Sequence, residues 1–417
     1  MSSVWTSRYA ARSQQLRHSE IRELLKLTER PDMISFAGGL PAPEAFPLSE
    51  VRAACERVMQ EQGGQALQYS TTEGFPPLRD MIARHMARYG IETQVANVLV
   101  TSGSQQALDL VGKLFLDPGD VVVVEDPTYL GALQAFRAYE ARFVTVPVDE
   151  DGIRIDLLEE TLAVHRPKLL YLLPNFQNPS GVTMSELRRQ RVIELAARHD
   201  VAILEDDPYG QLRYEGDHRT PLMVLDAERA RGGLSPEAAS ESHVLYTSTL
   251  SKLLAPGFRV GWIAAPPAVI QSLVLLKQGT DLHTSTFSQM VAFETCRGGF
   301  LDRHVRQLRH VYANRREAMF AALARYMPPG VRWTRPEGGL FLWITLPAEL
   351  DARDVLRHAI EHLVAFVPGQ AFHASGGGHN TLRLNFSYCT PGRIATGVRR
   401  LGKVIEECLA STSQSAS

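Results

Sequence analysis

A single lysine, Lys252, stands among hydroxyl side chains in the stretch TSTLSKLLAPGFRVGW (residues 247–262), and Arg259 follows after a Pro-Gly turn. Both flanks are apolar and typical of strands, so we expect the lysine at a strand end, facing a cleft. A solvated surface loop is the alternative for this stretch alone, because most lysines are exposed. A lysine amine beside anion-binding groups would suit nucleophilic and proton-transfer chemistry.

Other polar residues follow other apolar runs. Ser104 and Gln105 open a predicted helix, where free backbone N–H groups and the helix dipole favour a phosphate, although helix N-caps use the same residues. Tyr129 follows VVVVEDP and would stack on a planar ring or pack in the core. Asn178 lies in NPSG, a sequence that also opens turns. Each residue alone therefore leaves the structural alternative open.

An acidic pair ends the run VAILEDD, and Tyr209 follows three residues after Asp206. A carboxylate at the end of a buried strand needs a partner, because burial of an unpaired charge is costly. Asp206 is therefore a stronger indication of a site than the isolated tyrosines.

These residue types together match pyridoxal 5'-phosphate, whose ring, phosphate, phenolic oxygen and aldehyde each require a different partner. Lys252 would form the Schiff base and then move a proton between the substrate Cα and the cofactor. Asp206 would keep the pyridine nitrogen protonated, because a negative neighbour raises the pKa of a cation. The remaining contacts would be Asn178 and Tyr209 to the phenolate oxygen, and Ser104, Gln105, Thr249 and Arg259 to the phosphate.

Strand-like runs that alternate with amphipathic helical stretches must position these residues. This alternation predicts an α/β fold with a mostly parallel sheet covered on both faces, and ligands bind beyond the carboxyl ends of such strands. The predicted strands lie within residues 98–103, 121–127, 142–148, 168–176, 201–209, 243–250 and 259–266.

From about residue 285 the pattern changes to long helices followed by GGLFLWITL and TLRLNFSYC, which predicts a second, smaller α+β domain. The polar segment 226–242 is expected to be an exposed loop or insertion. The predicted division is an N-terminal arm and substrate-covering segment (1–45, packed with the small domain), a large cofactor domain (46–285), a small domain (286–410) and a disordered tail (411–417).

Composition limits the function classes. The 417 residues carry a formal net charge of −2, which gives no general attraction for nucleic acid or an anionic membrane. The four scattered cysteines favour a reduced compartment and argue against a metal site or a disulfide framework. No apolar run approaches the roughly 18 residues of a membrane span. We therefore expect a cytoplasmic protein with small-molecule substrates, although the basic N-terminus superficially suits a transit peptide.

The chain resembles the fold-type-I pyridoxal phosphate aminotransferases of the aspartate aminotransferase superfamily, and more closely it resembles the bacterial 2-aminoadipate aminotransferases and the kynurenine/2-aminoadipate group. The resemblance implies their fold, with a seven-stranded large-domain sheet. Two departures are small: Thr249 replaces the serine that lies three residues before the lysine in the family, and NPSG replaces the commoner NPTG. The ordered motifs that carry the resemblance are LQYSTTEGFPPLR, TSGSQQALDLVGKLFLDPGD, FQNPSG, EDDPYG, LSKLLAPGFRVGW, KQGTDLHT, AFVPGQAF and NTLRLNFSYC.

The resemblance also implies roles that spacing does not show. Tyr69 resembles a tyrosine that reaches the phosphate of a neighbouring subunit, which implies a homodimer. Arg383 matches the arginine that binds the substrate α-carboxylate, although by pattern alone it is an edge-strand surface charge. Gly39 belongs to the segment that covers the substrate. Ser19 and Arg22 match the part that reads the distal group of the substrate, whereas by pattern alone Arg22 lies on the polar face of a helix.

The expected activity is transfer of an amino group between L-2-aminoadipate, with glutamate and other amino acids, and 2-oxoglutarate, in lysine biosynthesis through aminoadipate. A broad-specificity aromatic, kynurenine or branched-chain aminotransferase is the second interpretation. A third is the effector half of a transcription regulator, but the arm before the aminotransferase pattern is too short for a winged-helix domain and the net charge is not basic.

Overall fold

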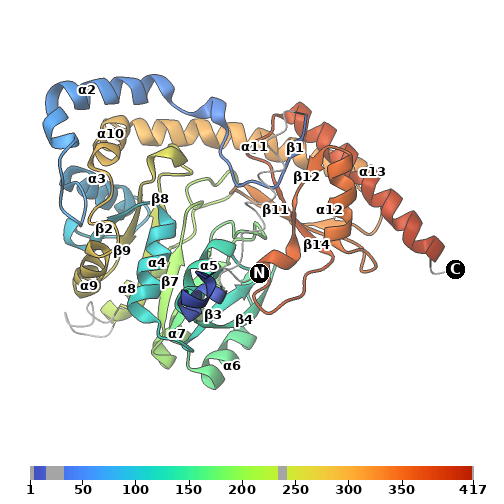
Figure 1. The fold of residues 1–417 in the computed structure, drawn as a ribbon, viewed down its shortest axis with the longest axis horizontal. Helices are drawn as coiled ribbons and strands as arrows, with labels where there is room; N and C mark the ends of the chain where they lie inside the picture. Colours follow the sequence, from blue (N-terminus) through green and yellow to red (C-terminus); the bar gives the residue numbers. More distant parts are fainter. Residues whose placement is uncertain (1–3, 16–31, 233–241, 416–417) are drawn as a thin grey trace.

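An eight-stranded sheet forms the centre of the larger part of the protein (Figure 1). The computed structural model describes residues 4–15, 32–232 and 242–415. The strand order is β2-β9-β8-β7-β6-β3-β4-β5. The pairs from β8 to β4 are parallel, whereas β9 is antiparallel to both of its neighbours. The strands are β2 (Val98–Thr101), β3 (Val121–Asp126), β4 (Arg142–Asp149), β5 (Gly152–Ile153), β6 (Leu169–Leu172), β7 (Ala202–Asp206), β8 (Val244–Thr249) and β9 (Gly261–Ala264).

All seven predicted runs form strands of this sheet, and the mostly parallel arrangement is confirmed. The prediction of seven strands omits the eighth, β5, which pairs antiparallel with the end of β4 at the sheet edge. Two residues are too short to show an alternation of apolar and polar positions, so the sequence carries no signal for this strand.

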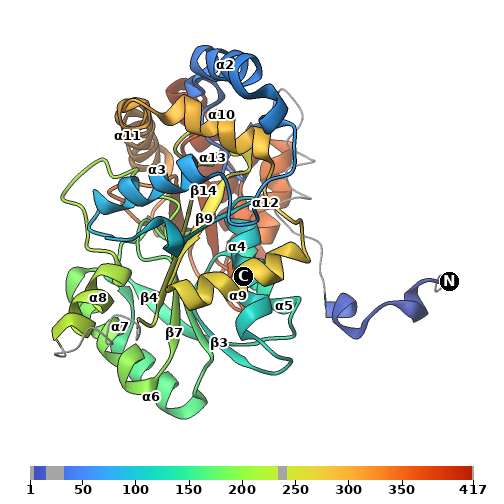
Figure 2. The same cartoon turned by 90° about the vertical axis from the view of Figure 1, so that its left-hand side faces the viewer.

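Helices cover both faces of the sheet because successive strand residues point to opposite sides. Val122 and Val124 pack in the cluster with α4 (Ser104–Phe115), α5 (Leu130–Arg137) and α9 (Pro267–Gln278). Val121 and Val123 pack in the opposite cluster, and Figure 2 shows the two helix layers on either side of the strands. The helices of this opposite layer are α6 (Ile155–His165), α7 (Glu186–His199) and α8 (Leu222–Gly232).

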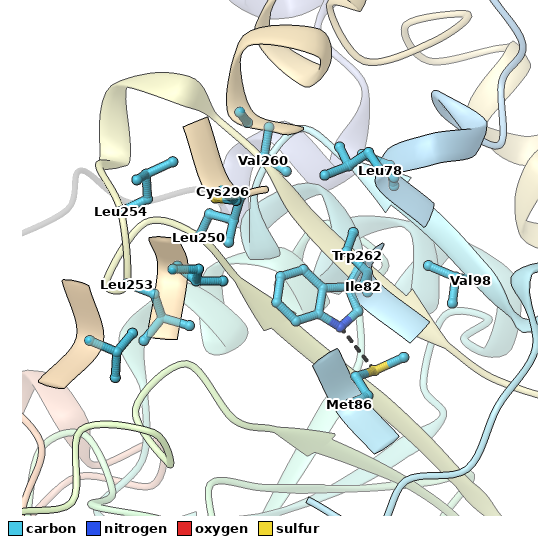
Figure 3. Packing of buried hydrophobic residues seen from close by; sticks show 14 of the residues in the cluster. Leu78, Ile82, Met86, Val98, Leu250, Leu253, Leu254, Val260, Trp262 and Cys296 are labelled. Carbon is cyan, nitrogen blue, oxygen red and sulfur yellow. Dashed lines mark hydrogen bonds between the residues drawn. The ribbon is translucent and has the colours of Figure 1, made fainter. Parts of the chain in front are cut away.

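A further apolar cluster covers β2, β9 and β8 on the side away from α4. Trp262 lies at its centre and donates a hydrogen bond from Nε1 to the sulfur of Met86 at 3.2 Å (Figure 3). The covering helices are α2 (Leu48–Ala66), α3 (Pro76–Ala87), α10 (Thr286–Cys296) and the first half of α11 (Phe300–Tyr326).

The smaller part contains an antiparallel sheet in the order β10-β11-β14-β13 and the parallel pair β1-β12. Its core also contains the second half of α11. The remaining elements are β1 (Ile34–Ser35), β10 (Arg332–Trp333), β11 (Phe341–Thr345), α12 (Ala352–Glu361), β12 (Val364–Ala365), β13 (Val367–Pro368), β14 (Thr381–Asn385) and α13 (Pro391–Ser415), with short 3-10 helices η1 (Thr6–Arg8), η2 (Ala11–Gln15), η3 (Pro43–Ala45), η4 (Val95–Asn97), η6 (Pro256–Phe258) and η7 (Gly369–Phe372).

Two segments of the structure do not follow the predicted division, which stays a prediction. The small domain was expected from residue 286, but α10 and the start of α11 pack with the large domain, and α11 continues into the small domain as one helix (Figure 1). A continuous helix shows no break where its packing partner changes. The tail expected to be disordered from residue 411 is helical through Ser415, because α13 continues past the last residues that it buries.

Within the part of the chain that the structure describes, none of the helices combines the length and apolar character that a bilayer span requires. The N-terminal strand β1 pairs with β12, and Phe36 packs in the core of the small domain.

Candidate active site

The sheet register brings the start of α4 beside the turn that carries Lys252. Thr101 at the end of β2 and Thr249 at the end of β8 both pair with Gly261. Gly261 has no room for a side chain, because a Cβ there would lie 2.8 Å from the backbone nitrogen of Ser104. The carboxyl ends of β2 and β8 therefore open at one edge of the sheet, with the first turn of α4 between them.

Lys252 lies in a turn anchored by leucines on either side of it. Leu250, Leu253 and Leu254 are buried in the cluster around Trp262 (Figure 3). The lysine side chain donates a hydrogen bond from Nζ to the carbonyl oxygen of Gly39 at 2.7 Å. Burial lowers the pKa of Lys252 to about 8, and two nearby arginine charges act in the same direction. The amine is therefore much closer to its neutral form at physiological pH than an exposed lysine.

The start of α4 forms a cradle for an anion. Gly103 has φ +80°, and a Cβ there would overlap the guanidinium of Arg259, so glycine is required. Arg259 Nη2 donates to the carbonyl oxygen of Ser102 at 3.3 Å. The buried hydroxyl of Ser104 has no hydrogen-bond partner among the described residues. A helix N-terminus, an arginine and an unpartnered hydroxyl together suit a phosphate.

Two residues predicted at the phosphate make other contacts through their side chains. The Thr249 hydroxyl lies 2.8 Å from the carbonyl oxygen of Val260 and 2.9 Å from the Ser251 hydroxyl, so it stabilises the lysine turn. Gln105 donates from Nε2 to the carbonyl oxygen of Gly131 at 3.0 Å. Both lie beside the cradle, but their side chains are directed to these protein partners.

Asp206 is buried at the end of β7 and accepts a hydrogen bond of 2.8 Å from Tyr171 to Oδ2. Its Oδ1 atom has no hydrogen-bond partner in residues 4–15, 32–232 and 242–415. Burial raises the pKa of Asp206 to about 7, against the effect of the Tyr171 bond, and the neighbouring Asp207 raises it further. A cationic N–H group opposite Oδ1 would restore the ionised form.

Arg383, on β14, is fully buried, which excludes the alternative of an edge-strand surface charge. Its Nη1 donates to Oδ1 of Asn178 at 2.7 Å, and its Nη2 donates to the carbonyl oxygen of Ala37 at 2.6 Å. Its guanidinium lies 4.1 Å from the ring centre of Phe341 and 5.0 Å from that of Phe372. Burial lowers the pKa of Arg383 to about 10. The planar fork is thus held rigidly, and a carboxylate would be its natural partner.

Tyr209 and Tyr129 complete the cluster. Tyr209 is buried, with its ring edge-on to Phe341 at 5.9 Å, and burial raises its pKa while a hydrogen bond with Asn178 lowers it. Tyr129 precedes α5 and lies against Gly131, where a Cβ would approach the tyrosine ring to 2.5 Å. The charges of Tyr129 and Arg383 both influence Tyr209, so the three side chains lie in one region.

The structure does not bring every predicted residue into this cluster. Tyr69 is 78% exposed, and its ring contacts the ring of His283 edge-on at 5.9 Å. Gly39 is in the cluster, and a Cβ there would lie 2.8 Å from the Phe341 ring. Ser19 and Arg22 lie outside the described residues.

Sequence reasoning missed Tyr171 and the two phenylalanines that flank Arg383. Tyr171 is hidden in the apolar run LLYL, although a buried tyrosine hydroxyl needs a partner and Asp206 was the available one. Phe341 and Phe372 carry no polar atom, so they gave no chemical signal.

These residues fit pyridoxal 5'-phosphate. The orphaned Asp206 Oδ1 suits the pyridine N–H group, the orphaned Ser104 hydroxyl and the Gly103 cradle suit the phosphate, and the weakly basic Lys252 amine suits the aldehyde. This fold and site define a pyridoxal phosphate dependent transferase of fold type I.

The family model for aminotransferase class I and II matches residues 31–401. The chain belongs to this family and is a pyridoxal phosphate dependent transaminase whose substrates are amino acids and oxo acids. It is 48% identical to aromatic-amino-acid aminotransferase 1 of Thermococcus litoralis, over 94% of this chain and 92% of the relative. It is 46% identical to the 2-aminoadipate transaminase of Thermus thermophilus, over 97% and 98% of the two chains.

A solved structure of the α-aminoadipate aminotransferase LysN from Thermus thermophilus, complexed with N-(5'-phosphopyridoxyl)-L-leucine, matches with a TM-score of 0.90 and 43% identity. The match covers 98% of this chain and the whole of the other. The expected fold and cofactor are thereby confirmed.

Proposed function

We propose that this aminotransferase transfers the amino group between L-2-aminoadipate and 2-oxoglutarate, with glutamate and other amino acids as further donors. The observation that carries this proposal is the similarity, over nearly the whole of both chains, to a relative named 2-aminoadipate transaminase. The matching reaction sequence would be lysine biosynthesis through aminoadipate. The four cysteines are free, which supports the expectation of a reducing cytoplasm.

The residues of the cluster would have separate roles in binding the substrate, activating the cofactor and transferring the proton. Arg383 would hold the substrate α-carboxylate by paired hydrogen bonds, because its guanidinium is fixed by Asn178 and the Ala37 carbonyl. Pyridoxal phosphate, when bound, supplies an aldehyde for the amino group and a ring that withdraws electrons. Asp206 would hold a proton on the ring nitrogen through Oδ1.

The remaining residues would bind the cofactor and transfer the proton. Lys252 would move a proton at Nζ, since its lowered pKa lets the neutral amine act as a base. Asn178 and Tyr209 would bind the phenolic oxygen of the cofactor, and Tyr129 would stack on the ring. The phosphate would lie in the cradle of Gly103, Ser104 and Arg259. Thr249 and Gln105 would stabilise the backbone on either side of this cradle through their hydrogen bonds to protein partners.

Recognition of both 2-aminoadipate and glutamate is expected, because they differ by one methylene group. Such a difference is worth only about 1–3 kcal/mol in a binding pocket. Ser19 and Arg22 are proposed to read the distal carboxylate, an assignment supported by the family resemblance of the stretch HSEIRELL.

Preference for aromatic, kynurenine or branched-chain donors is the second candidate. It is favoured by the relative named aromatic-amino-acid aminotransferase, whose identity of 48% is slightly higher than that of the 2-aminoadipate transaminase. The two candidates share the cofactor and Arg383, so only the pocket for the distal group distinguishes them.

A donor panel tests the proposal. The cofactor-loaded protein is mixed with 2-aminoadipate, glutamate, leucine, kynurenine or phenylalanine, and the change in cofactor absorption is followed in a single turnover. The acidic-substrate proposal predicts fast conversion with 2-aminoadipate and a selective loss of at least tenfold for acidic donors in Arg22→Ala. Arg306→Ala, which removes an exposed arginine on α11, is the matched control and should change no rate.

Rapid conversion of phenylalanine or kynurenine, with slow conversion of 2-aminoadipate and no effect of Arg22→Ala, would establish the second candidate instead. Lys252→Ala should abolish conversion of every donor. Conversion of a donor by Lys252→Ala at the wild-type rate would contradict the role proposed for the lysine.

We also propose a homodimer in which Tyr69 reaches the phosphate of the neighbouring subunit. The exposure of this aromatic side chain supports the proposal, since a tyrosine that is 78% exposed makes little use of its apolar ring within its own subunit.

A further inference from the structure

Lys277, in the last turn of α9, is completely buried and lies outside the cluster described above. Its ammonium group donates to Oδ1 of Asp281 at 2.6 Å and to Oε1 of Gln106 at 3.0 Å. Burial lowers the pKa of Lys277, and the contact with Asp281 opposes this change. Burying a lysine beside a partly exposed carboxylate gives little net stability, so the ion pair needs another explanation.

Both partners of Lys277 also hold Ser102, the residue before Gly103. Asp281 Oδ2 accepts a hydrogen bond from the Ser102 hydroxyl at 3.0 Å. Gln106 Oε1 accepts a hydrogen bond from the backbone N–H of Ser102 at 2.7 Å. The ammonium group therefore fixes, through two short bridges, the backbone that leads into the first turn of α4.

Ser102 in turn connects to the other side of the phosphate cradle. Its carbonyl oxygen accepts the hydrogen bond from Arg259 Nη2, whose guanidinium packs against Gly103. A displacement of Ser102 would therefore misplace both the backbone N–H groups at the start of α4 and the guanidinium of Arg259. Binding groups that are already in position lose less conformational entropy when the ligand arrives.

We propose that Lys277 and Asp281 are positioning residues for the cofactor phosphate. They hold the Ser102–Ser104 loop in the conformation that binds the phosphate, and no contact between them and the phosphate is required. The inference rests on the proposed placement of the phosphate at the start of α4. The consequence is selective: loss of the ion pair weakens binding of pyridoxal 5'-phosphate but leaves binding of pyridoxal, which has no phosphate, unchanged.

The test measures the dissociation constants of both compounds for the cofactor-free protein by titration of absorbance. Asp281→Asn should weaken pyridoxal 5'-phosphate about tenfold, the loss expected for one charge-assisted hydrogen bond, and change pyridoxal less than about twofold. Glu294→Gln is the matched control, because Glu294 is buried and pairs with Arg57 at 2.9 Å without contacting Ser102. It should change neither constant.

Two further variants keep the proposal falsifiable. Ser102→Ala removes the hydrogen bond to Asp281 while leaving the ion pair intact, so it should reproduce the selective loss even if Asp281→Asn does not fold. Arg259→Ala tests the phosphate placement itself. Without a selective loss in Arg259→Ala the placement is wrong. Suppose that Arg259→Ala shows the selective loss. The positioning role is then rejected if Asp281→Asn and Ser102→Ala weaken the binding of both compounds equally, or if they weaken the binding of neither compound. No amino acid is present, so the result is independent of substrate preference.

Discussion

Tyr171 donates a hydrogen bond of 2.8 Å to one carboxylate oxygen of Asp206, and the other oxygen has no partner among the residues that the structure describes. Both side chains are buried, and burial raises the pKa of Asp206 to about 7. The Tyr171 hydroxyl, which is neutral, thus fixes the orientation of the carboxyl group. The negative charge of the ionised carboxylate would have to be balanced by a ligand. A ring nitrogen that carries a proton would supply that balance.

Replacement of Asp206 by asparagine should slow amino transfer far more than it weakens cofactor binding. The amide keeps the shape of the side chain but cannot stabilise a protonated ring nitrogen, so we expect the single-turnover rate to fall about 100- to 1,000-fold. Rapid mixing with a donor amino acid measures this rate. Tyr171→Phe, which removes only the orienting hydrogen bond, should cause a smaller loss. Equal rates for Asp206→Asn and the wild type would remove the carboxylate from the reaction.

The same carboxylate should make the cofactor-free protein less stable at alkaline pH. Because its folded pKa of about 7 lies above the ordinary value of 3.8, its contribution to stability is fully present below pH 4 and is lost as the pH rises through 7. Asp206→Asn removes this loss. The free energy of unfolding of the variant, relative to the wild type, should therefore increase by roughly 2–4 kcal/mol between pH 4 and 8. Urea titrations at each pH measure the difference, and a constant difference would contradict the raised pKa.

The sequence indicated the positions of the residues proposed for catalysis better than it indicated their surroundings. Asp206 and Lys252 were found because Asp206 ends an apolar strand and Lys252 closely follows one, and the ends of parallel strands meet at one edge. Tyr171 was missed because it belongs to the strand itself. Phe341 and Phe372 were missed because they come from the small domain, and no local pattern indicates which distant ring will stack on Arg383.

The packing of the longest helix shows a similar limit. The spacing of apolar residues predicts that residues 300–326 are helical. It does not indicate that Tyr312 packs with the large domain and Met319 with the small one. The partner of a helix face is a tertiary property. Arg383 shows the same limit, since its pattern alone suited an exposed edge strand, whereas the structure buries it and only the family resemblance suggested a substrate role.

Arg383→Lys should impair the use of amino acids while preserving the charge. A lysine cannot reproduce the planar fork that lies against Phe341 and Phe372, and losing one hydrogen bond to a carboxylate costs about 1.5–3 kcal/mol, so kcat/KM should fall at least about tenfold. Initial rates with 2-aminoadipate and with 5-aminopentanoate, which lacks the α-carboxylate, separate the causes: only the former should decline. The same exchange at buried Arg315, on α11, is the control. A parallel decline for both amines would indicate general damage to the fold.

Covalent attachment of the cofactor should depend on the ionisation of Lys252. Only the neutral amine attacks an aldehyde, and burial together with the charges of Arg383 and Arg259 lowers the pKa of the amine to about 8. The rate of attachment to the cofactor-free protein should increase about tenfold per pH unit below 8 and level off above it. Stopped-flow absorbance from pH 6 to 10 measures this profile, with Lys252→Ala as the variant that shows no attachment. A rate that continues to rise to pH 10 would place the pKa near that of an exposed lysine.

Mixed dimers would establish whether Tyr69 serves the neighbouring site. Tyr69→Ala and Lys252→Ala each impair every site of their own homodimer. In a hybrid of the two, one site would combine an intact Lys252 with the intact tyrosine of the other subunit. Random mixing in equal amounts makes half of the dimers hybrids with one complete site each, so activity should recover to about a quarter of the wild-type value.

The mixed preparation should be denatured and refolded together, with each variant refolded alone as the control. If Tyr69 serves the site of its own chain, every site in the hybrid lacks either the tyrosine or the lysine, and mixing then restores nothing. Recovery near one quarter would therefore support both the dimer and the crossing of Tyr69 between subunits, because no monomeric arrangement of the two variants contains a complete site.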